Sequence, residues 1–140
     1  MTDGDLANEM ANLSRGDELD VFEVRLTSED VRAYLAATGE SAANWGSNTP
    51  PLALGALALG GLMERTGIPE GLLHTGQEFE FLRPVAHGVP VEVRIVVASA
   101  SERRGALMVA FELGLHARGE LVGTGRTSII VAPAGDSGVE

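Results

Sequence analysis

The sequence lacks cysteine and lysine throughout its 140 residues. Without cysteine, the chain can form neither disulfide bonds nor thiolate metal sites, and this composition fits a reducing cytoplasm. Without lysine, all ten basic side chains are arginines, and the net charge of −10 argues against nucleic acid or an anionic membrane as a partner. The longest apolar run is shorter than the roughly 20 residues that span a bilayer, and the acidic start is unlike a signal peptide. We therefore expect a cytoplasmic protein.

The length predicts one domain, which is large enough to bury a hydrophobic core without disulfide bonds. Residues 1–14 and 133–140 are polar or rich in small residues, and we expect them to be flexible tails. The expected domain therefore runs from residue 15 to residue 132, with no repeat or internal linker.

Local signals predict a first helix after residue 27. Thr27 offers a capping oxygen, Asp30 three residues later completes a capping box, and Gly39 provides a stop. Residues 40–49 are then expected to form a loop.

A second helix is predicted to begin at the proline pair 50–51, and its residues 52–63 carry no charge. A helix that is apolar on every side must be covered by other elements. Its small residues are expected to let the backbone of a sheet come close, although the glycine pair 60–61 can also break or kink it. Residues 67–69 (Gly-Ile-Pro) are expected to end it.

Alternating apolar residues predict five strands, in residues 22–26, 73–81, 91–97, 107–115 and 122–131. In the second strand, the alternation predicts a shared face for Leu73, Thr75, Phe79 and Phe81. The short turns between the last four strands indicate an antiparallel, meander-like sheet. One curved antiparallel sheet wrapped around one central apolar helix is an α+β domain with the hotdog fold.

Several segments, in this order, resemble MaoC-type hotdog proteins, the group of (R)-specific enoyl-thioester hydratases and 3-hydroxyacyl-thioester dehydratases. These segments are Leu26–Val31 with Tyr34 and Thr38–Glu40, then Pro51–Leu57, Gln77–Val85 with Gly88, and Gly119–Val122. The resemblance covers about residues 17–132. It implies lyase chemistry on an acyl thioester of coenzyme A or of a carrier protein, without a cofactor or a metal.

The resemblance also implies site residues. In the family, a carboxylate and an imidazole five residues apart on the loop hold the water, and a glycine amide near the helix N-terminus binds the thioester oxygen. Gly55 matches that glycine, although helix packing is an equal interpretation. Asn44, in the same loop, and Arg83, a possible phosphate fork after the second strand, are the other substrate-binding candidates.

The chain departs from the family at the acid–base pair. The aspartate position is Glu40 and the histidine position is Trp45, whose indole nitrogen donates a proton in a hydrogen bond but cannot accept one. Trp45 is therefore expected to plug the vacated pocket or to stack on a ligand.

Two other polar residues, His74 and Glu64, are candidate catalytic residues. His74 is expected to lie on the face of its strand opposite Phe79 and Phe81, and with Glu40 it forms the candidate catalytic pair. Glu64, near the end of the second helix, is the carboxylate that a hotdog thioesterase would use. The three histidines show no metal-ligand spacing.

The leading hypothesis is therefore a hydratase or dehydratase subunit that has lost its own Asp–His pair. It would work in a homodimer or in a heterodimer with a second hotdog chain. The alternatives are a stand-alone hydratase or thioesterase with altered catalytic residues, and a non-enzymatic acyl-thioester binder.

Overall fold

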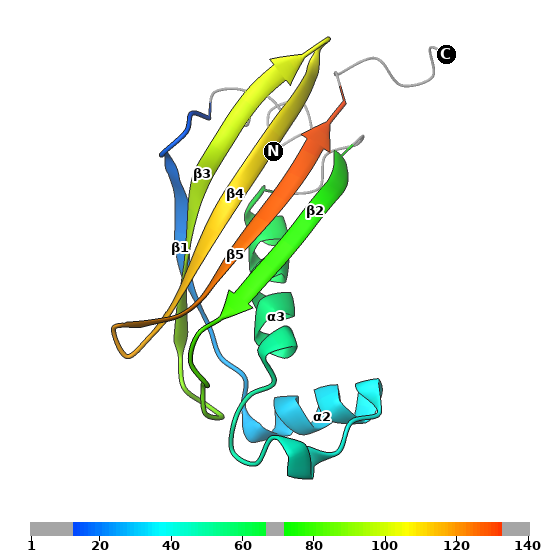
Figure 1. The fold of residues 1–140 in the computed structure, drawn as a ribbon, viewed down its shortest axis with the longest axis vertical. Helices are drawn as coiled ribbons and strands as arrows, with labels where there is room; N and C mark the ends of the chain where they lie inside the picture. The colour runs from blue at the N-terminus through cyan, green and yellow to red at the C-terminus, as the bar shows by residue number, and fades with distance from the viewer. Residues whose placement is uncertain (1–12, 67–71, 133–140) are drawn as a thin grey trace.

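The computed structural model describes residues 13–66 and 72–132, which form one curved sheet and two α-helices (Figure 1). In chain order the elements are β1 (Glu18–Val24), α2 (Ser28–Thr38), a short 3-10 helix (Ala42–Asn44), α3 (Pro51–Thr66), β2 (Leu72–Phe81), β3 (Val91–Arg103), β4 (Ala106–Ala117) and β5 (Glu120–Val131). The predicted helix stop at residues 67–69 lies outside the described residues. So do the predicted tails, except Leu13 and Ser14.

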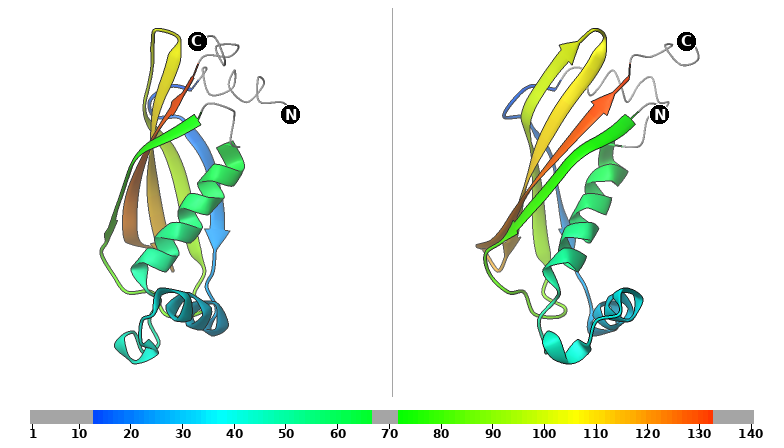
Figure 2. Two further views of the ribbon diagram at one scale, coloured as in Figure 1. Left: turned by 90° about the vertical axis from the view of Figure 1, so that its right-hand side faces the viewer. Right: turned by 45° about the vertical axis from the view of Figure 1, so that its right-hand side comes forward.

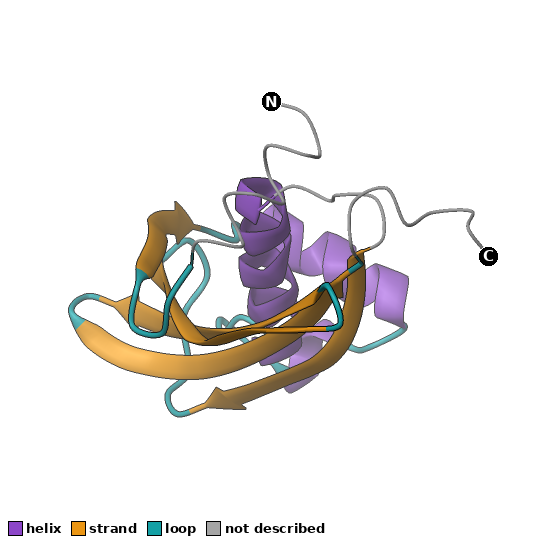
Figure 3. Cartoon of the chain, turned by 90° about the horizontal axis from the view of Figure 1, so that it is seen from above, coloured by secondary structure: helices purple, strands orange, loops and turns teal. Residues whose placement is uncertain are grey.

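All neighbouring strands are antiparallel, and their order across the sheet is β1-β3-β4-β5-β2. The predicted meander is correct for β3, β4 and β5 only. β1 pairs with β3 on the side where a meander would place β2, and β2 pairs with β5 at the far edge. Figures 2 and 3 show the sheet curving around α3, which lies across one face. This arrangement is the hotdog fold.

The core lies between α3 and the face of the sheet that carries the predicted apolar alternation. On β3, for example, Val91, Val93, Ile95 and Val97 are buried, and the residues between them are not. From α3, Leu54, Ala58 and Leu62 enter the same cluster. The opposite side of α3 is open in the single chain, where Leu52 is 68% exposed. No helix in the described ranges is long and apolar enough to cross a membrane.

Two of the three glycines of α3 make room for aromatic rings, not for sheet backbone as the sequence predicts. A methyl group added at Gly55 would lie 3.1 Å from the ring of Phe79, and one at Gly61 would collide with the ring of Phe22. A methyl group at Gly60 would meet nothing within 4 Å. The helix runs unbroken through the glycine pair to Thr66, which excludes the alternative of a break there.

A bulge in β2 changes which side chains face α3. The β2–β5 register shifts between His74 and Gly76, so Thr75 is an extra residue. His74 pairs with the buried Ile129, and Phe79 pairs with Gly125 on the same face. The prediction that His74 and Phe79 lie on opposite faces of β2 is therefore wrong, because one inserted residue reverses the alternation. For the same reason Leu73 lies on the outer face, where it is 64% exposed.

The predicted capping box at the start of α2 is confirmed in both directions. The Asp30 amide donates to the Thr27 hydroxyl at 3.1 Å, and the Thr27 amide donates to the Asp30 carboxylate at 3.0 Å. The hydrogen bond from the Thr27 backbone amide, followed by a smaller contribution from the Thr27 side chain, lowers the pKa of the Asp30 carboxyl. Gly39 ends the helix in the left-handed conformation with φ of 77°.

Candidate functional site

The candidate site lies at the end of the molecule where α2 and the 40–49 loop meet the beginning of α3 (Figure 2). The left-handed turn at Gly39 reverses the chain, and the Glu40 amide donates to the Leu35 carbonyl at 3.0 Å. Glu40 is thereby fixed directly after the helix. The short 3-10 helix Ala42–Asn44 then leads to Trp45.

Glu40 and Trp45, the two residues at the acid–base positions, contact each other. The indole Nε1–H of Trp45 donates to Oε1 of Glu40 at 3.0 Å. Glu40 is exposed and Trp45 is half-buried. The five-residue spacing therefore does bring the two side chains together, as the pattern implies. The result is a carboxylate held by an N–H donor, with no imidazole in the pair.

His87 fastens this loop to the rest of the domain, a role that sequence reasoning missed. Its Nε2 lies 3.2 Å from the Asn48 carbonyl, and its Nδ1 lies 3.1 Å from the Ser28 hydroxyl. Since a carbonyl only accepts, Nε2 carries the proton that is donated to Asn48. The backbone adds the bond from the His87 amide to the Ser47 carbonyl and the bond from the Thr49 amide to the Val85 carbonyl. The β2–β3 connection therefore holds both the loop and the start of α2.

The first turn of α3 offers one backbone donor. Pro51 has no N–H, and the amides of Ala53 and Leu54 donate to the Pro50 carbonyl. Within the described residues, the Leu52 amide has no hydrogen-bond partner, and it lies at the positive end of the helix dipole. Gly55 is the fifth residue of α3, and regular helix geometry directs its amide to the Pro51 carbonyl. The packing role of Gly55 against Phe79 is visible, whereas its predicted role in substrate binding stays a prediction.

The remaining predicted residues are spread over the domain. Asn44 is exposed in the 3-10 helix beside Trp45, and Arg83 is exposed in the segment that follows β2. His74 lies four paired positions from Phe79, about 14 Å along β2, so within one chain it is remote from this loop. Glu64 lies twelve residues from Leu52 on α3, which is about 18 Å.

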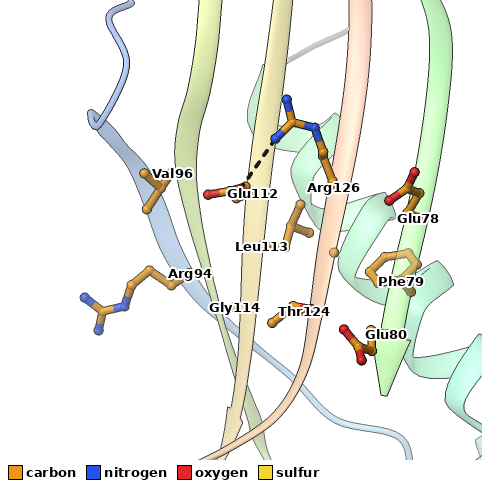
Figure 4. Close-up of a pocket in the computed structure, with 11 residues that line it drawn as sticks. Glu78, Phe79, Glu80, Arg94, Val96, Glu112, Leu113, Gly114, Thr124 and Arg126 are labelled. Carbon is orange, nitrogen blue, oxygen red and sulfur yellow. Dashed lines mark hydrogen bonds and ion pairs between the residues drawn. The ribbon is translucent and has the colours of Figure 1, made fainter. Parts of the chain in front are cut away.

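A hollow of about 610 Å³ lies on the outer face of the sheet, away from this loop. Figure 4 shows its lining, in which Arg126 and Glu112 form an ion pair at 3.5 Å and Glu78 and Glu80 project from β2. All four of these charged side chains are exposed, so this hollow has the solvated charges of an ordinary sheet face. No group of three metal-ligating side chains occurs in residues 13–66 and 72–132.

Solved structures with this arrangement are numerous, although no family model and no curated protein matches the sequence. An (R)-hydratase from A. caviae involved in PHA biosynthesis is 20% identical, with a TM-score of 0.70 over 87% of this chain and 98% of that one. A MaoC-like dehydratase from Rhodospirillum rubrum is 18% identical, with a TM-score of 0.68 over 87% and 94%.

A chain of the HadBC (3R-hydroxyacyl-ACP dehydratase) complex from Mycobacterium tuberculosis is 22% identical, with a TM-score of 0.62 over 86% and 98% of the two chains. At these identities the likeness establishes the fold. The chain has the hotdog fold that is shared by (R)-hydratases and MaoC-like dehydratases.

Proposed function

We propose that this chain is a hydratase- or dehydratase-type subunit that acts on acyl thioesters and completes its site with another hotdog chain. The observation that carries the proposal is the Glu40–Trp45 hydrogen bond. The loop retains the family's spacing and a carboxylate, but an indole occupies the position of the imidazole. The fold likeness to hydratases and dehydratases supports the class of reaction, and the HadBC complex is a precedent for two chains working together.

Hydration of an enoyl thioester needs a base for water, a proton for the α-carbon and a donor for the thioester oxygen. Glu40 can hold the water, and the Trp45 N–H fixes the direction of the carboxylate. The Leu52 amide, at the positive end of α3, is a donor for the oxygen. Indole cannot accept a proton. An imidazole is therefore the missing group, and another chain is the source that we propose.

The thioesterase alternative receives less support from the geometry. Within one chain, Glu64 lies about 18 Å from Leu52 along α3, too far to act on an acyl group whose carbonyl is bound at the first turn of the same helix. It lines instead a groove between α3 and β1.

The test is crotonyl-CoA hydration by the purified chain, measured below and above the concentration at which it self-associates, and after co-expression with a hotdog chain that carries an Asp–His pair. We expect turnover per chain to rise by about 10²-fold or more on assembly, the usual value of an acid–base partner. Glu40→Gln should abolish the gain, and Glu92→Gln on the outer face is the matched control.

Two results would contradict the proposal. One is turnover per chain that is independent of assembly, which would mean that the chain is complete alone. The other is the absence of both thioester binding and turnover in every assembly.

A further inference from the structure

The ring of Phe79 lies between α3 and β5 and contacts both. Its Cδ2–Cε2 edge faces Gly55, where an added methyl group would lie 3.1 Å from both atoms. Its Cδ1–Cε1 edge faces Gly125, the residue of β5 that pairs with Phe79, and a methyl group there would lie 2.5 Å from Cε1. These two edges are opposite sides of one ring. Phe79 therefore fills the space between the helix and the sheet at this level.

A second ring continues this packing toward the end of β2. Phe81 stacks on Phe79 with the ring centroids 5.7 Å apart. A methyl group added at Gly123 would lie 3.2 Å from Cδ1 of Phe81, so each ring lies over a glycine of β5. Both rings are half-buried. The end of β2 therefore presents an aromatic surface, made by Phe79 and Phe81, to the first turns of α3.

The same face of β2 becomes polar directly beyond Phe79. The next residue on this face is Gln77, whose side-chain oxygen accepts a hydrogen bond from the Thr127 hydroxyl at 2.7 Å. Thr127 is fully buried, so the polar pair reaches the interior between the sheet and α3. An alkyl chain gains binding free energy by leaving water for apolar surroundings, and the Gln77–Thr127 pair does not provide them.

The Phe79 ring meets α3 one helical turn from the backbone donor of the candidate site. Gly55 follows Leu52 by three residues, which is about 4.5 Å along the helix. The carrier of an acyl thioester is bulky and must stay in solvent. An acyl group whose carbonyl accepts from the Leu52 amide therefore points inward, toward Gly55 and the ring. Three carbon–carbon bonds of about 1.5 Å cover this distance, which corresponds to roughly a four-carbon acyl group.

We propose that Phe79 limits the length of the acyl chain, and that the substrates are short-chain acyl thioesters of about four carbons, the size of crotonyl and 3-hydroxybutyryl groups. The inference rests on the acyl-thioester site of the proposed function and adds the substrate class to it. A longer chain has to displace the ring from both glycines, and it then meets the Gln77–Thr127 pair. Phe79 touches the end of the acyl chain and takes no part in proton transfer.

The length limit can be measured without turnover. Trp45 is the only tryptophan of the chain, and it contacts Glu40 in the candidate site, so its fluorescence reports binding there. The probes are butyryl-, hexanoyl-, octanoyl- and decanoyl-CoA, which have no double bond to hydrate, with free coenzyme A as the reference. The purified chain is used above the concentration at which it self-associates. We expect butyryl-CoA to bind about tenfold or more tightly than octanoyl-CoA.

Removal of the ring should remove this limit. In Phe79→Ala we expect octanoyl-CoA to bind about tenfold or more tightly than in the wild type, with a smaller change for butyryl-CoA. Phe79→Leu is a milder second variant, which tests the same point if the alanine variant does not fold. Phe22→Leu is the matched control, because it removes a ring that packs on Gly61 of the same helix, on the β1 side.

The ratio of the octanoyl-CoA and butyryl-CoA affinities distinguishes a length limit from a purely structural role. A loss of stability, followed by the melting temperature, weakens both ligands alike and leaves the ratio unchanged. A wild-type chain that binds octanoyl-CoA at least as tightly as butyryl-CoA overturns the inference. So does a ratio that stays at the wild-type value in the Phe79 variants, or one that changes equally in Phe22→Leu.

The outcomes separate this inference from the proposed function. An assembled chain that hydrates crotonyl- and octenoyl-CoA equally well refutes the length limit and leaves the proposed function standing. A Phe79-dependent limit in binding, without hydration in any assembly, supports the limit and refutes the hydratase activity. A chain that binds no acyl-CoA more tightly than free coenzyme A and hydrates none refutes both.

Discussion

Trp45 donates its indole proton to Glu40 at 3.0 Å, across the five residues that separate them. A carboxylate that accepts this bond is oriented, but it gains no partner that can exchange a proton with water. The loop therefore brings together a carboxylate and an N–H donor, and the function that we propose takes its proton acceptor from another chain.

Under the proposed function, an imidazole at position 45 should give the loop hydration chemistry of its own. In the double variant Glu40→Asp/Trp45→His, we expect crotonyl-CoA hydration per chain to rise by about 10²-fold or more, the typical contribution of an acid–base group. Trp45→Phe removes the N–H donor without adding a base, and it serves as the control. Equal rates in the two variants would show that more than the imidazole is missing.

Removing the hydrogen bonds of the His87 ring should make the 40–49 loop more mobile. His87→Ala removes two hydrogen bonds of a half-buried ring, to Asn48 and Ser28. We expect the free energy of unfolding to fall by about 1–3 kcal/mol. Hydrogen exchange should speed up at the Thr49 and Gly88 amides. Faster exchange spread evenly over the domain would contradict a local role, and His116→Ala, on the outer face of β4, is the comparison.

The neighbouring glycines of α3 should respond in opposite directions to the same substitution. Gly60→Ala should raise the free energy of unfolding by up to about 1 kcal/mol, because alanine favours the helix and its methyl group meets nothing. Gly61→Ala should lower it by about 1–3 kcal/mol, because the methyl group collides with the buried Phe22 ring. Urea denaturation of both variants measures the difference. A stabilised Gly61→Ala variant would contradict the packing described above.

Two hairpin turns place an arginine in the left-handed region, Arg104 with φ of 54° and Arg118 with φ of 53°, each followed by a glycine. Asparagine tolerates this conformation better than a long side chain does. We expect Arg104→Asn to raise the free energy of unfolding by about 0.5–1 kcal/mol. Arg103→Asn, at the end of β3, is the matched control and should not stabilise. Equal effects of the two changes would point to charge, not conformation.

Asp30 should make the start of α2 sensitive to acid. Hydrogen bonds from Thr27 lower the pKa of this carboxyl below its ordinary 3.8. The stabilisation is therefore present above the unfolded pKa, and it is lost as the pH falls through the folded pKa. A carbon-13 NMR titration of the carboxyl should show the low midpoint in the wild type and an upward shift in Thr27→Ala. A wild-type midpoint at or above 3.8 would contradict the capping geometry.

Much of the fold could be predicted because its signals are local. The capping box at Thr27 and the stop at Gly39 each depend on a few neighbouring residues, and both appear as expected. The charge-free run from Leu52 likewise indicates a covered helix in any context, and α3 forms there. The alternation in β3 predicts the residues that face the core.

The remaining features depend on contacts between distant segments. Nothing near β2 in the sequence indicates that it pairs with β5 at the far edge, or that Thr75 is an extra residue. The spacing of Glu40 and Trp45 indicates proximity, but the hydrogen bond between them depends on the path of the loop through the left-handed Gly39 and the short 3-10 helix. No local signal marks the role of His87, because its partners Ser28 and Asn48 are 59 and 39 residues away.

The extra residue in β2 has a consequence for evolution as well as for chemistry. Deleting Thr75 would make the strand regular, but His74 would then stand next to Gly76 and would still pair with Ile129 on the helix side. A strand of unchanged length that took Thr75 into its pairing would instead turn His74 to the solvent side and Leu73 to the helix side. An alignment that ignores this single gap would assign the histidine of a relative to the wrong side of the sheet.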